Sequence, residues 1–305
     1  MPIDSGLGIL VGVDNRAEVR AFLTSRRGKV TPESAGLTAY GNRRVTGLRR
    51  GEVAMLAGVS VEYYTRLERG SLRGVSDSVL DALARALQLT ETEQSHLIDL
   101  ARAGNATPAR RRSAPASPTV RPGVLRMLDA MPTLPAFVQN NRFDVLVANP
   151  LGRALYSEMY ADPGCRGNIT RFVFLSPGAR RFYADWERVA RGAVGALRVE
   201  AAKNPYDREL SNLIGELSTR SDTFRVLWGA QDVHVIRDGT KRFHHPVVGD
   251  VELQYESLDV PGDVALSVAV YSPAPGSPSE DALTVLASWS VTAQLPQEAE
   301  AESDR

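Results

Sequence analysis

In the first third of the chain, hydrophobic residues recur every three or four positions, which is the spacing of amphipathic helices. The pattern predicts a first helix, two short helices at 49–57 and 61–69, a fourth helix, and a fifth at 90–104. Thr90 and Glu93 have the spacing of a capping box at the start of the fifth. The apolar stripes of the first and fourth helices are Val19, Phe22, Leu23 and Leu80, Leu83, Ala84, Leu87. The sequence therefore predicts an all-α N-terminal domain.

The pattern changes in the second half, where alternating hydrophobic and polar residues predict strands. Strands are predicted at 137–139, 143–148, 233–237, 251–255 and 264–270. A hairpin is expected around Asn140-Asn141-Arg142 and a tight turn at Asp238-Gly239. Helices are predicted from Ser176-Pro177 onward, at 208–217, 223–228 and 279–288, with Ser176 as the cap of a long helix that includes Phe182 and Trp186. An antiparallel sheet of about five strands, with helices inserted after the second, is an α+β pattern.

Two segments have few large apolar residues and cannot bury enough surface to fold by themselves. Residues 104–122 are rich in Ala, Pro, Ser and Arg and form the predicted linker, and residues 293–305 form a predicted disordered tail. The predicted domains are therefore residues 16–103 and residues 123–292. The cluster Arg110-Arg111-Arg112 is expected to be a solvated part of the linker or to lie beside a polyanion.

Charge is divided unevenly along a chain whose formal net charge is zero. Residues 1–112 contain 17 Lys and Arg against 12 Asp and Glu, so the remainder is acidic. Such asymmetry suggests that the N-terminal part meets a polyanion. Cys165 is the single cysteine, which excludes a disulfide framework within one chain and fits a reducing compartment. We expect a cytoplasmic protein without a signal peptide, because no basic residue precedes the short apolar stretch at 7–13, and no run is long enough to cross a bilayer.

Residues 47–70, GLRRGEVAMLAGVSVEYYTRLERG, have the pattern of a helix-turn-helix. Ala54 is small enough for close helix packing, and Gly58 suits a tight turn that needs a positive φ. Ser60 is a good N-cap for the second helix, and Tyr64 and Leu67 are expected to face the core. A pair of helices with a basic solvated face, in a bundle of another function, is the alternative.

The outward face of the second helix is expected to enter the major groove. Arg66 is suited to guanine, Glu62 to cytosine, and Val61 and Thr65 to a thymine methyl. The residues expected on the phosphate backbone are Arg43, Arg44, Arg49, Arg50, Tyr63 and Arg69. Since one recognition helix contacts too few bases to find a genomic site, a homodimer on paired half-sites of double-stranded DNA is expected.

These residues also resemble a known family. Residues 43–70 resemble the DNA-binding domain of Xre-type, lambda-repressor-like regulators, and LRRGEVAMLAGVSVEYYTRLERG resembles the MmyB-like branch. The resemblance continues in PAFVQNNRFDVLVANPLGRAL, FYADWERVARGAVGALRVEAAKNPYD, SDTFRVLWGAQDV and RFHHPVVGDVELQYESL. It implies that the C-terminal domain is a PAS-like, MltR-type ligand-binding domain, and that its ligand is a fatty acid or another small apolar molecule in an apolar cavity.

Three hypotheses for the C-terminal domain follow. In the first it is a sensor, and its ligand shifts the placement of two DNA-binding heads. The residues expected to line its pocket are Phe137, Trp186, Phe224, Trp228, Tyr255 and, as a polar anchor, His245. In the second it is a dimerisation or protein-interaction module without a ligand. The third, an enzyme, has little support, since there is no phosphate-binding loop, GxSxG, HExxH or CxxC motif, and adjacent His244 and His245 would face opposite sides of a strand. No metal, cofactor or membrane is expected.

Overall fold

A computed structural model describes residues 15–38, 45–105, 119–233, 238–262 and 265–303. The chain divides into two compact units, one built from residues 1–114, 198–215 and 227–234, the other from residues 115–197, 216–226 and 235–305. Among the described residues, no helix is long and apolar enough to span a membrane.

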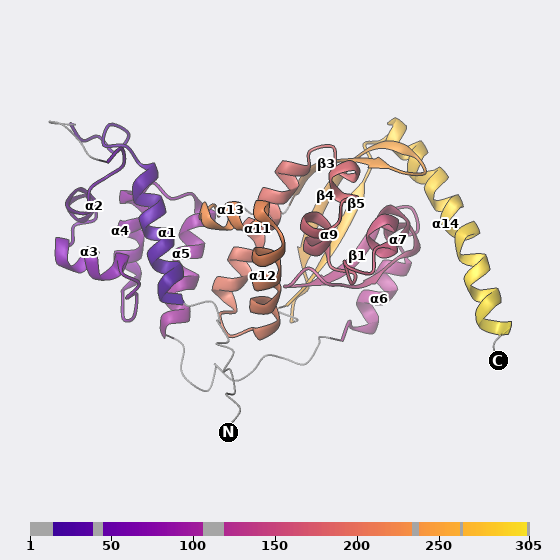
Figure 1. Ribbon diagram of the computed structural model, residues 1–305, viewed down its shortest axis with the longest axis horizontal. Helices are drawn as coiled ribbons and strands as arrows, with labels where there is room; N and C mark the ends of the chain where they lie inside the picture. The colour runs from indigo at the N-terminus through magenta and orange to yellow at the C-terminus, as the bar shows by residue number, and fades with distance from the viewer. Residues whose placement is uncertain (1–14, 39–44, 106–118, 234–237, 263–264, 304–305) are drawn as a thin grey trace, which may run out of the picture. The chain divides into compact units, whose positions relative to one another are not determined.

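The first unit contains the five predicted helices (Figure 1). They are α1 (Asn15–Lys29), α2 (Arg50–Leu56), α3 (Val61–Glu68), α4 (Asp77–Ala86) and α5 (Glu91–Asn105). All the predicted stripe residues of α1 and α4 are buried. The capping box is confirmed, because the backbone amide of Thr90 donates to Glu93 Oε2 (2.9 Å) and that of Glu93 donates to Thr90 Oγ1 (3.3 Å).

Two later segments complete this first unit. Ala202 and Val233 belong to the same hydrophobic core as α1 and α5. Arg198 is fully buried, and its guanidinium pairs with the carboxylate of Glu18 and donates to Gln231 Oε1 (2.8 Å). The helical head is thus completed by residues about a hundred positions downstream.

The second unit is built on a five-stranded antiparallel sheet in the order β2-β1-β5-β4-β3. Its strands are β1 (Ala136–Asn140), β2 (Val145–Ala148), β3 (Asp238–His245), β4 (Gly249–Asp259) and β5 (Leu266–Ser272). The helices between β2 and β3 are α7 (Pro150–Leu155), α8 (Ser157–Ala161), α9 (Ile169–Leu175), α10 (Ala179–Phe182), α11 (Trp186–Lys203), α12 (Arg208–Arg220) and α13 (Asp222–Gly229), of which the last three have residues in both units. The predicted α+β pattern, with its helices after the second strand, is confirmed.

Both faces of this sheet are covered by helices. α6 (Pro122–Asp129) buries Leu128 against Val138, Leu266 and Val268 on one face. Helices α9 and α11 lie over the other face (Figure 1). The alternation predicted for Val251, Leu253 and Tyr255 is confirmed in β4. In β5 both faces are largely buried, which explains why its apolar pattern is nearly continuous.

The prediction of one long helix from Ser176-Pro177 is wrong, because the helical conformation is interrupted between α10 and α11. Tyr183 bridges to Phe243, and the amide of Ala184 donates to the carbonyl of Arg242 (3.1 Å). The backbone at 183–185 therefore pairs with β3, and the long helix begins only at Trp186. Phe182 consequently lies on α10 and not on the face of α11.

The structure also differs from the predicted turn at Asp238-Gly239 and from the predicted start of the second strand. Asp238-Gly239 is not a tight turn but the first pair of residues in β3, opposite Glu256 and Tyr255, and the strand predicted at 233–237 falls mostly outside the described residues. Phe143, predicted in a strand, takes a φ of 64° in the turn between β1 and β2.

The tail after Pro296, predicted to be disordered, continues α14 (Pro278–Ser303), as its Ala, Glu and Gln content favours.

Candidate functional site

The helix-turn-helix in the first unit is formed by α2, the turn at Gly58 and α3. Gly58 has a φ of +65°, a conformation that favours glycine. The amide of Val59 donates to the carbonyl of Ala54 (2.9 Å), and Ser60 Oγ accepts from the amide of Tyr63 (3.0 Å). The turn and the N-cap predicted from the sequence are therefore present.

A buried ion-pair cluster fixes the inner side of α3. Tyr64 and Leu67 are fully buried, as predicted. The carboxylate of Glu68, also buried, accepts from Arg27 Nε (2.5 Å) on α1 and from Arg50 on α2. Because one carboxylate joins all three helices, the orientation of the outer face of α3 is tied to α1 and α2.

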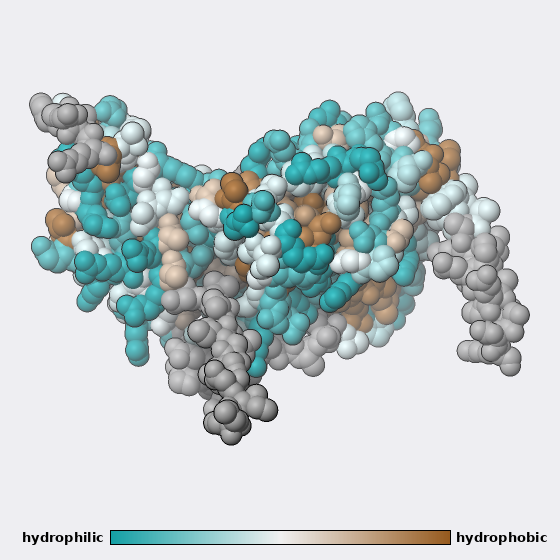
Figure 2. Space-filling view, in the orientation of Figure 1, coloured by the Kyte–Doolittle hydropathy of each residue, from teal (hydrophilic) through white to brown (hydrophobic). Residues whose placement is uncertain are grey.

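The outer face of α3 borders a shallow surface groove. This groove is lined by Arg16, Val61, Glu62, Thr65, Arg66, Arg69 and Ser71. Arg66 lies over the ring of Tyr63, with its guanidinium carbon 4.7 Å from the ring centre. The surface around α2 and α3 is largely hydrophilic, with a few hydrophobic patches (Figure 2). The groove thus brings together all four residues predicted to contact bases, together with Arg69.

The other residues predicted to contact DNA are placed as follows. Arg49 is exposed at the N-cap of α2 and Tyr63 is half-buried. Arg50 is half-exposed, but its guanidinium is bonded to Glu68, so its first role is structural. Arg43 and Arg44 lie outside the described residues. Sequence reasoning missed Arg16, which reaches the groove from the start of α1.

A close backbone contact positions Arg16 beside α3. A side chain at Gly70, whose φ is +97°, would place its Cβ 2.3 Å from the carbonyl oxygen of Arg16. Only glycine permits this approach. The glycine that ends the helix-turn-helix motif was therefore the available signal for a contribution from α1.

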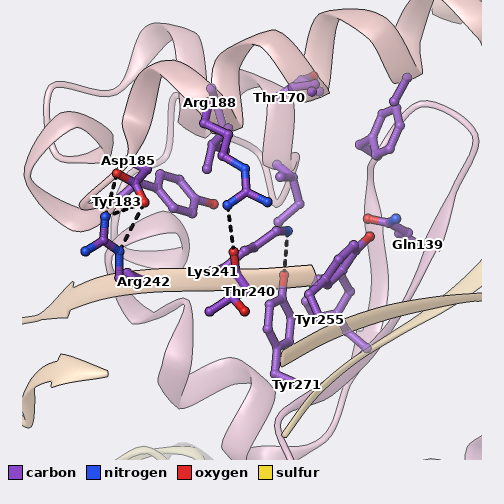
Figure 3. Close-up of a pocket in the computed structure, with 18 residues that line it drawn as sticks. Gln139, Thr170, Tyr183, Asp185, Arg188, Thr240, Lys241, Arg242, Tyr255 and Tyr271 are labelled. Atoms are coloured by element: carbon purple, nitrogen blue, oxygen red, sulfur yellow. Dashed lines mark hydrogen bonds and ion pairs between the residues drawn. The ribbon is translucent and has the colours of Figure 1, made fainter. Parts of the chain in front are cut away.

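A pocket of about 90 Å³ lies in the second unit between the sheet and helices α9 and α11 (Figure 3). Its apolar wall includes Phe137, Phe143, Ile169, Val173, Val189, Ala193 and Ala196. Its polar residues are Gln139, Thr170, Tyr183, Asp185, Arg188, Thr240, Lys241, Arg242, Tyr255 and Tyr271. Small residues at Gly192, Ala193 and Ala196 on α11 leave the space between that helix and the sheet.

The charges around this pocket are unequal. Among the described residues that line it, Asp185 is the one carboxylate beside three cations, and it is already bonded to Arg242, with its Oδ2 2.7 Å from Nη2. Arg188 donates to the carbonyl of Thr240 (3.4 Å). Lys241 donates from Nζ to Tyr271 Oη (3.2 Å), and Nζ lies 3.6 Å from the ring centre of Tyr255. Arg188 and Lys241 therefore give the pocket an excess of positive charge.

Lys241 is half-buried, and the burial of its amine together with the nearby positive charge of Arg188 lowers its pKa to about 7. The hydroxyl of Tyr271 is also 2.7 Å from that of Tyr156, which in turn accepts from Tyr183 (3.5 Å). Burial raises the pKa of Tyr156 to about 12. The amine of Lys241 thus lies at one end of a row of hydrogen-bonded, neutral tyrosine hydroxyl groups.

The residues predicted to line a ligand pocket divide into two groups. Phe137 and Tyr255 line it. The other four pack elsewhere. Trp186 donates to the carbonyl of Val173 (2.9 Å), and Phe224 packs edge-on against Phe174. Trp228 lies under Arg198 in the first unit, and His245, the predicted anchor, is buried with Nε2 3.0 Å from the carbonyl oxygen of Ala154. These four residues therefore contribute to packing and hydrogen bonding away from the pocket.

Lys241 and Arg188 are among the polar groups of this pocket that sequence reasoning missed. Alternation in β3 gave a signal for Lys241, because it shares one face with Phe243 and His245, which are both buried. A lysine on the inward face of a strand is unusual and points to a cavity. Arg188 had no comparable signal, since it follows the unpredicted break before α11.

The described residues contain no group of three or more His, Cys, Asp or Glu side chains that could hold a metal ion. Burial raises the pKa of Cys165 to about 12, so its thiol is unreactive. Burial lowers the pKa of His96 to about 3, and the ring packs edge-on against Phe22. His244, on the exposed face of β3, contacts Asp250 instead.

Two known domain families match the chain. Residues 18–97 match a helix-turn-helix domain family, and residues 120–286 match the MmyB-like transcription regulator ligand binding domain family. No curated protein matches the chain. Both families are domains of transcription regulators, and the second covers more than half of the chain. The protein is therefore a DNA-binding transcription regulator and a member of the MmyB-like ligand-binding domain family.

Proposed function

We propose that this regulator binds a specific operator as a homodimer in the cytoplasm, and that a small ligand with an apolar body and an acidic head controls it. The observation that supports sequence specificity is the outer face of α3, where Val61, Glu62, Thr65 and Arg66 line one groove. The fixed cluster at Glu68 holds that face in one orientation. Preorganised donors and acceptors are what base recognition needs.

On DNA, Arg66 would pair with guanine and Glu62 would accept from cytosine, while the methyl groups of Val61 and Thr65 meet thymine. Arg49, Arg69 and Tyr63 would contact phosphates and add affinity that falls with salt. Two α3 helices in a dimer would contact half-sites about one helical turn apart.

The pocket supports control by a ligand that resembles a short fatty acid. Its walls are mostly apolar, and Lys241 and Arg188 provide positive charge that no carboxylate of the pocket neutralises. An acidic head would be stabilised there. Each non-hydrogen atom needs about 25–30 Å³, so the 90 Å³ pocket holds about three or four of them. The carboxylate and first carbons of hexanoate fit this limit, whereas the rest of its chain, like that of a longer fatty acid, requires the pocket to open.

The first test is a DNA-binding titration of wild type, Arg66→Ala and Arg102→Ala at two salt concentrations. Arg102 is an exposed arginine on α5 that does not line the groove. Its substitution by alanine therefore removes the same charge away from the groove. The DNA is the intergenic region upstream of the protein's own gene, or fragments selected by binding. We expect Arg66→Ala to weaken operator binding by about 5- to 150-fold, the equivalent of 1–3 kcal/mol, with little change for Arg102→Ala. Equal effects of the two variants would contradict sequence recognition by α3.

Ligand control is tested by repeating the titration with hexanoate and by following the melting temperature. A rise in melting temperature together with a changed operator affinity supports control by the pocket. If neither changes with hexanoate or longer acids, the C-terminal domain is better explained as an interaction module without a ligand.

A further inference from the structure

The pocket contains a primary amine in an uncommon setting. The whole chain has three lysines, Lys29, Lys203 and Lys241. The first two are on the surface and form ion pairs with Asp232 and Glu200. Lys241 is the one that lines the cavity, where its side chain lies among Tyr255, Tyr271 and Arg188 (Figure 3).

The surroundings of this amine favour its neutral, nucleophilic form. The bonded neighbour of Nζ is the hydroxyl of Tyr271, and the carboxylate of Asp185 is bonded to Arg242 instead. Arg188 adds a like charge. The ring of Tyr255 stabilises the ammonium form and offsets part of this effect. With a pKa of about 7, roughly half of the amine is unprotonated at neutral pH, whereas an ordinary lysine is almost fully protonated.

We propose that Lys241 is a covalent binding site for a small apolar aldehyde, which it holds as an imine. This proposal rests on the proposed role of the pocket as a ligand site. A lysine that is desolvated and lies next to another cation is the recognised setting for imine formation. Here the two conditions come from the apolar wall of the pocket and from Arg188.

The reaction needs no oxidant or reductant. The lone pair of Nζ attacks the carbonyl carbon, the C=O π bond opens, and a proton moves from nitrogen to oxygen to give a carbinolamine. Loss of that hydroxyl group as water, with the remaining N–H proton released, forms the C=N bond. Tyr271 Oη, 3.2 Å from Nζ, is placed to donate a proton to the departing hydroxyl and to recover one from nitrogen. The enclosed apolar walls limit the water that would hydrolyse the product.

The size of the cavity defines the aldehyde. About three or four non-hydrogen atoms fit in 90 Å³. The aldehyde group and first carbons of hexanal are within this range, and the rest of its chain requires the pocket to open. The apolar carbons would lie against apolar lining residues such as Val189, Ala193 and Phe137.

The test is reductive trapping on the full-length protein. Wild type, Lys241→Arg and Lys241→Met are incubated with hexanal at pH 8, reduced with borohydride, and analysed by intact mass and peptide mapping. We expect a hexyl group at Lys241 of wild type, with at least about tenfold less label on Lys29 and Lys203. The N-terminal α-amine, whose usual pKa is about 8, is also labelled at pH 8, and peptide mapping separates it from Lys241. Neither variant should carry the label at position 241, and excess hexanoate should protect Lys241 of wild type.

The possible results distinguish a failure of the imine proposal from a failure of the proposed ligand control. Label spread equally over the three lysines, or absent from Lys241, overturns the imine proposal. If Lys241 is unlabelled while hexanoate still raises the melting temperature of wild type and Lys241→Arg, the pocket stands as a ligand site and only the covalent step fails. If hexanoate also has no effect, the proposed ligand control fails with it.

Discussion

Replacing Lys241 by methionine should stabilise the protein without ligand, and by an amount that depends on pH. Methionine keeps an unbranched side chain as far as Cε but removes the amine. In the folded protein the pKa of Lys241 is about 7, against an ordinary value of 10.5 for a lysine side chain in water. One unit of pKa corresponds to about 1.4 kcal/mol, so the protonated amine costs the folded state up to about 5 kcal/mol. The ring of Tyr255 reduces this cost by about 1 kcal/mol.

The sign follows from linkage. Between pH 7 and pH 10.5 the unfolded chain binds more protons at this residue than the folded chain, so wild-type stability rises with pH in that window. The cost is fully present below pH 7. We therefore expect Lys241→Met to exceed wild type by about 3–4 kcal/mol at pH 6 and by about 2 kcal/mol at pH 9.

Urea unfolding followed by tryptophan fluorescence measures this difference, because Trp186 is buried in the same unit as the pocket. Lys203→Met is the matched control, since Lys203 is on the surface. Its effect should be below about 0.5 kcal/mol at both pH values. A gain from Lys241→Met that is the same at pH 6 and pH 9 would refute the argument that Lys241 is desolvated.

Two further substitutions test the two sites. Glu68→Gln should destabilise the helical head by about 3–5 kcal/mol, because Arg27 and Arg50 lose their shared carboxylate, and thermal unfolding measures the loss. An unchanged melting temperature would show that the cluster does not hold α3. Ala193→Leu should fill the pocket and abolish the hexanoate-induced rise in melting temperature, while operator binding without ligand stays within about twofold of wild type. A persistent rise would place the ligand elsewhere.

The helix-turn-helix was predictable because its signals are local. Gly58, Ser60 and the apolar pair Tyr64 and Leu67 each act within a few residues of the turn. Their agreement leaves few alternative structures for the segment. The positions of base-contacting residues follow directly from the helical period of α3.

The errors arose where distant strands decide local structure. The backbone at Tyr183 and Ala184 leaves the helical pattern to bond with β3, about sixty residues later. Asp238-Gly239 has the composition of a turn, yet the register with β4 places it in a strand. For the pocket, large aromatic residues were chosen for their size, although most of them fill the core. The small residues of α11 and the inward-facing Lys241 create the cavity, and their effect depends on the packing of helix against sheet.

The two-part composition of the helical head limits how modular this regulator is. A fragment that ended at Asn105 would lack Ala202 and Val233 from its core and would leave Glu18 without its partner Arg198. Exposed apolar surface and an unpaired carboxylate would both lower its stability. Exchange of DNA-binding heads between related regulators, by recombination or by protein engineering, would therefore have to transfer residues 198–215 and 227–234 together with the head. Such a requirement ties the inheritance of operator choice to the helices that follow α10.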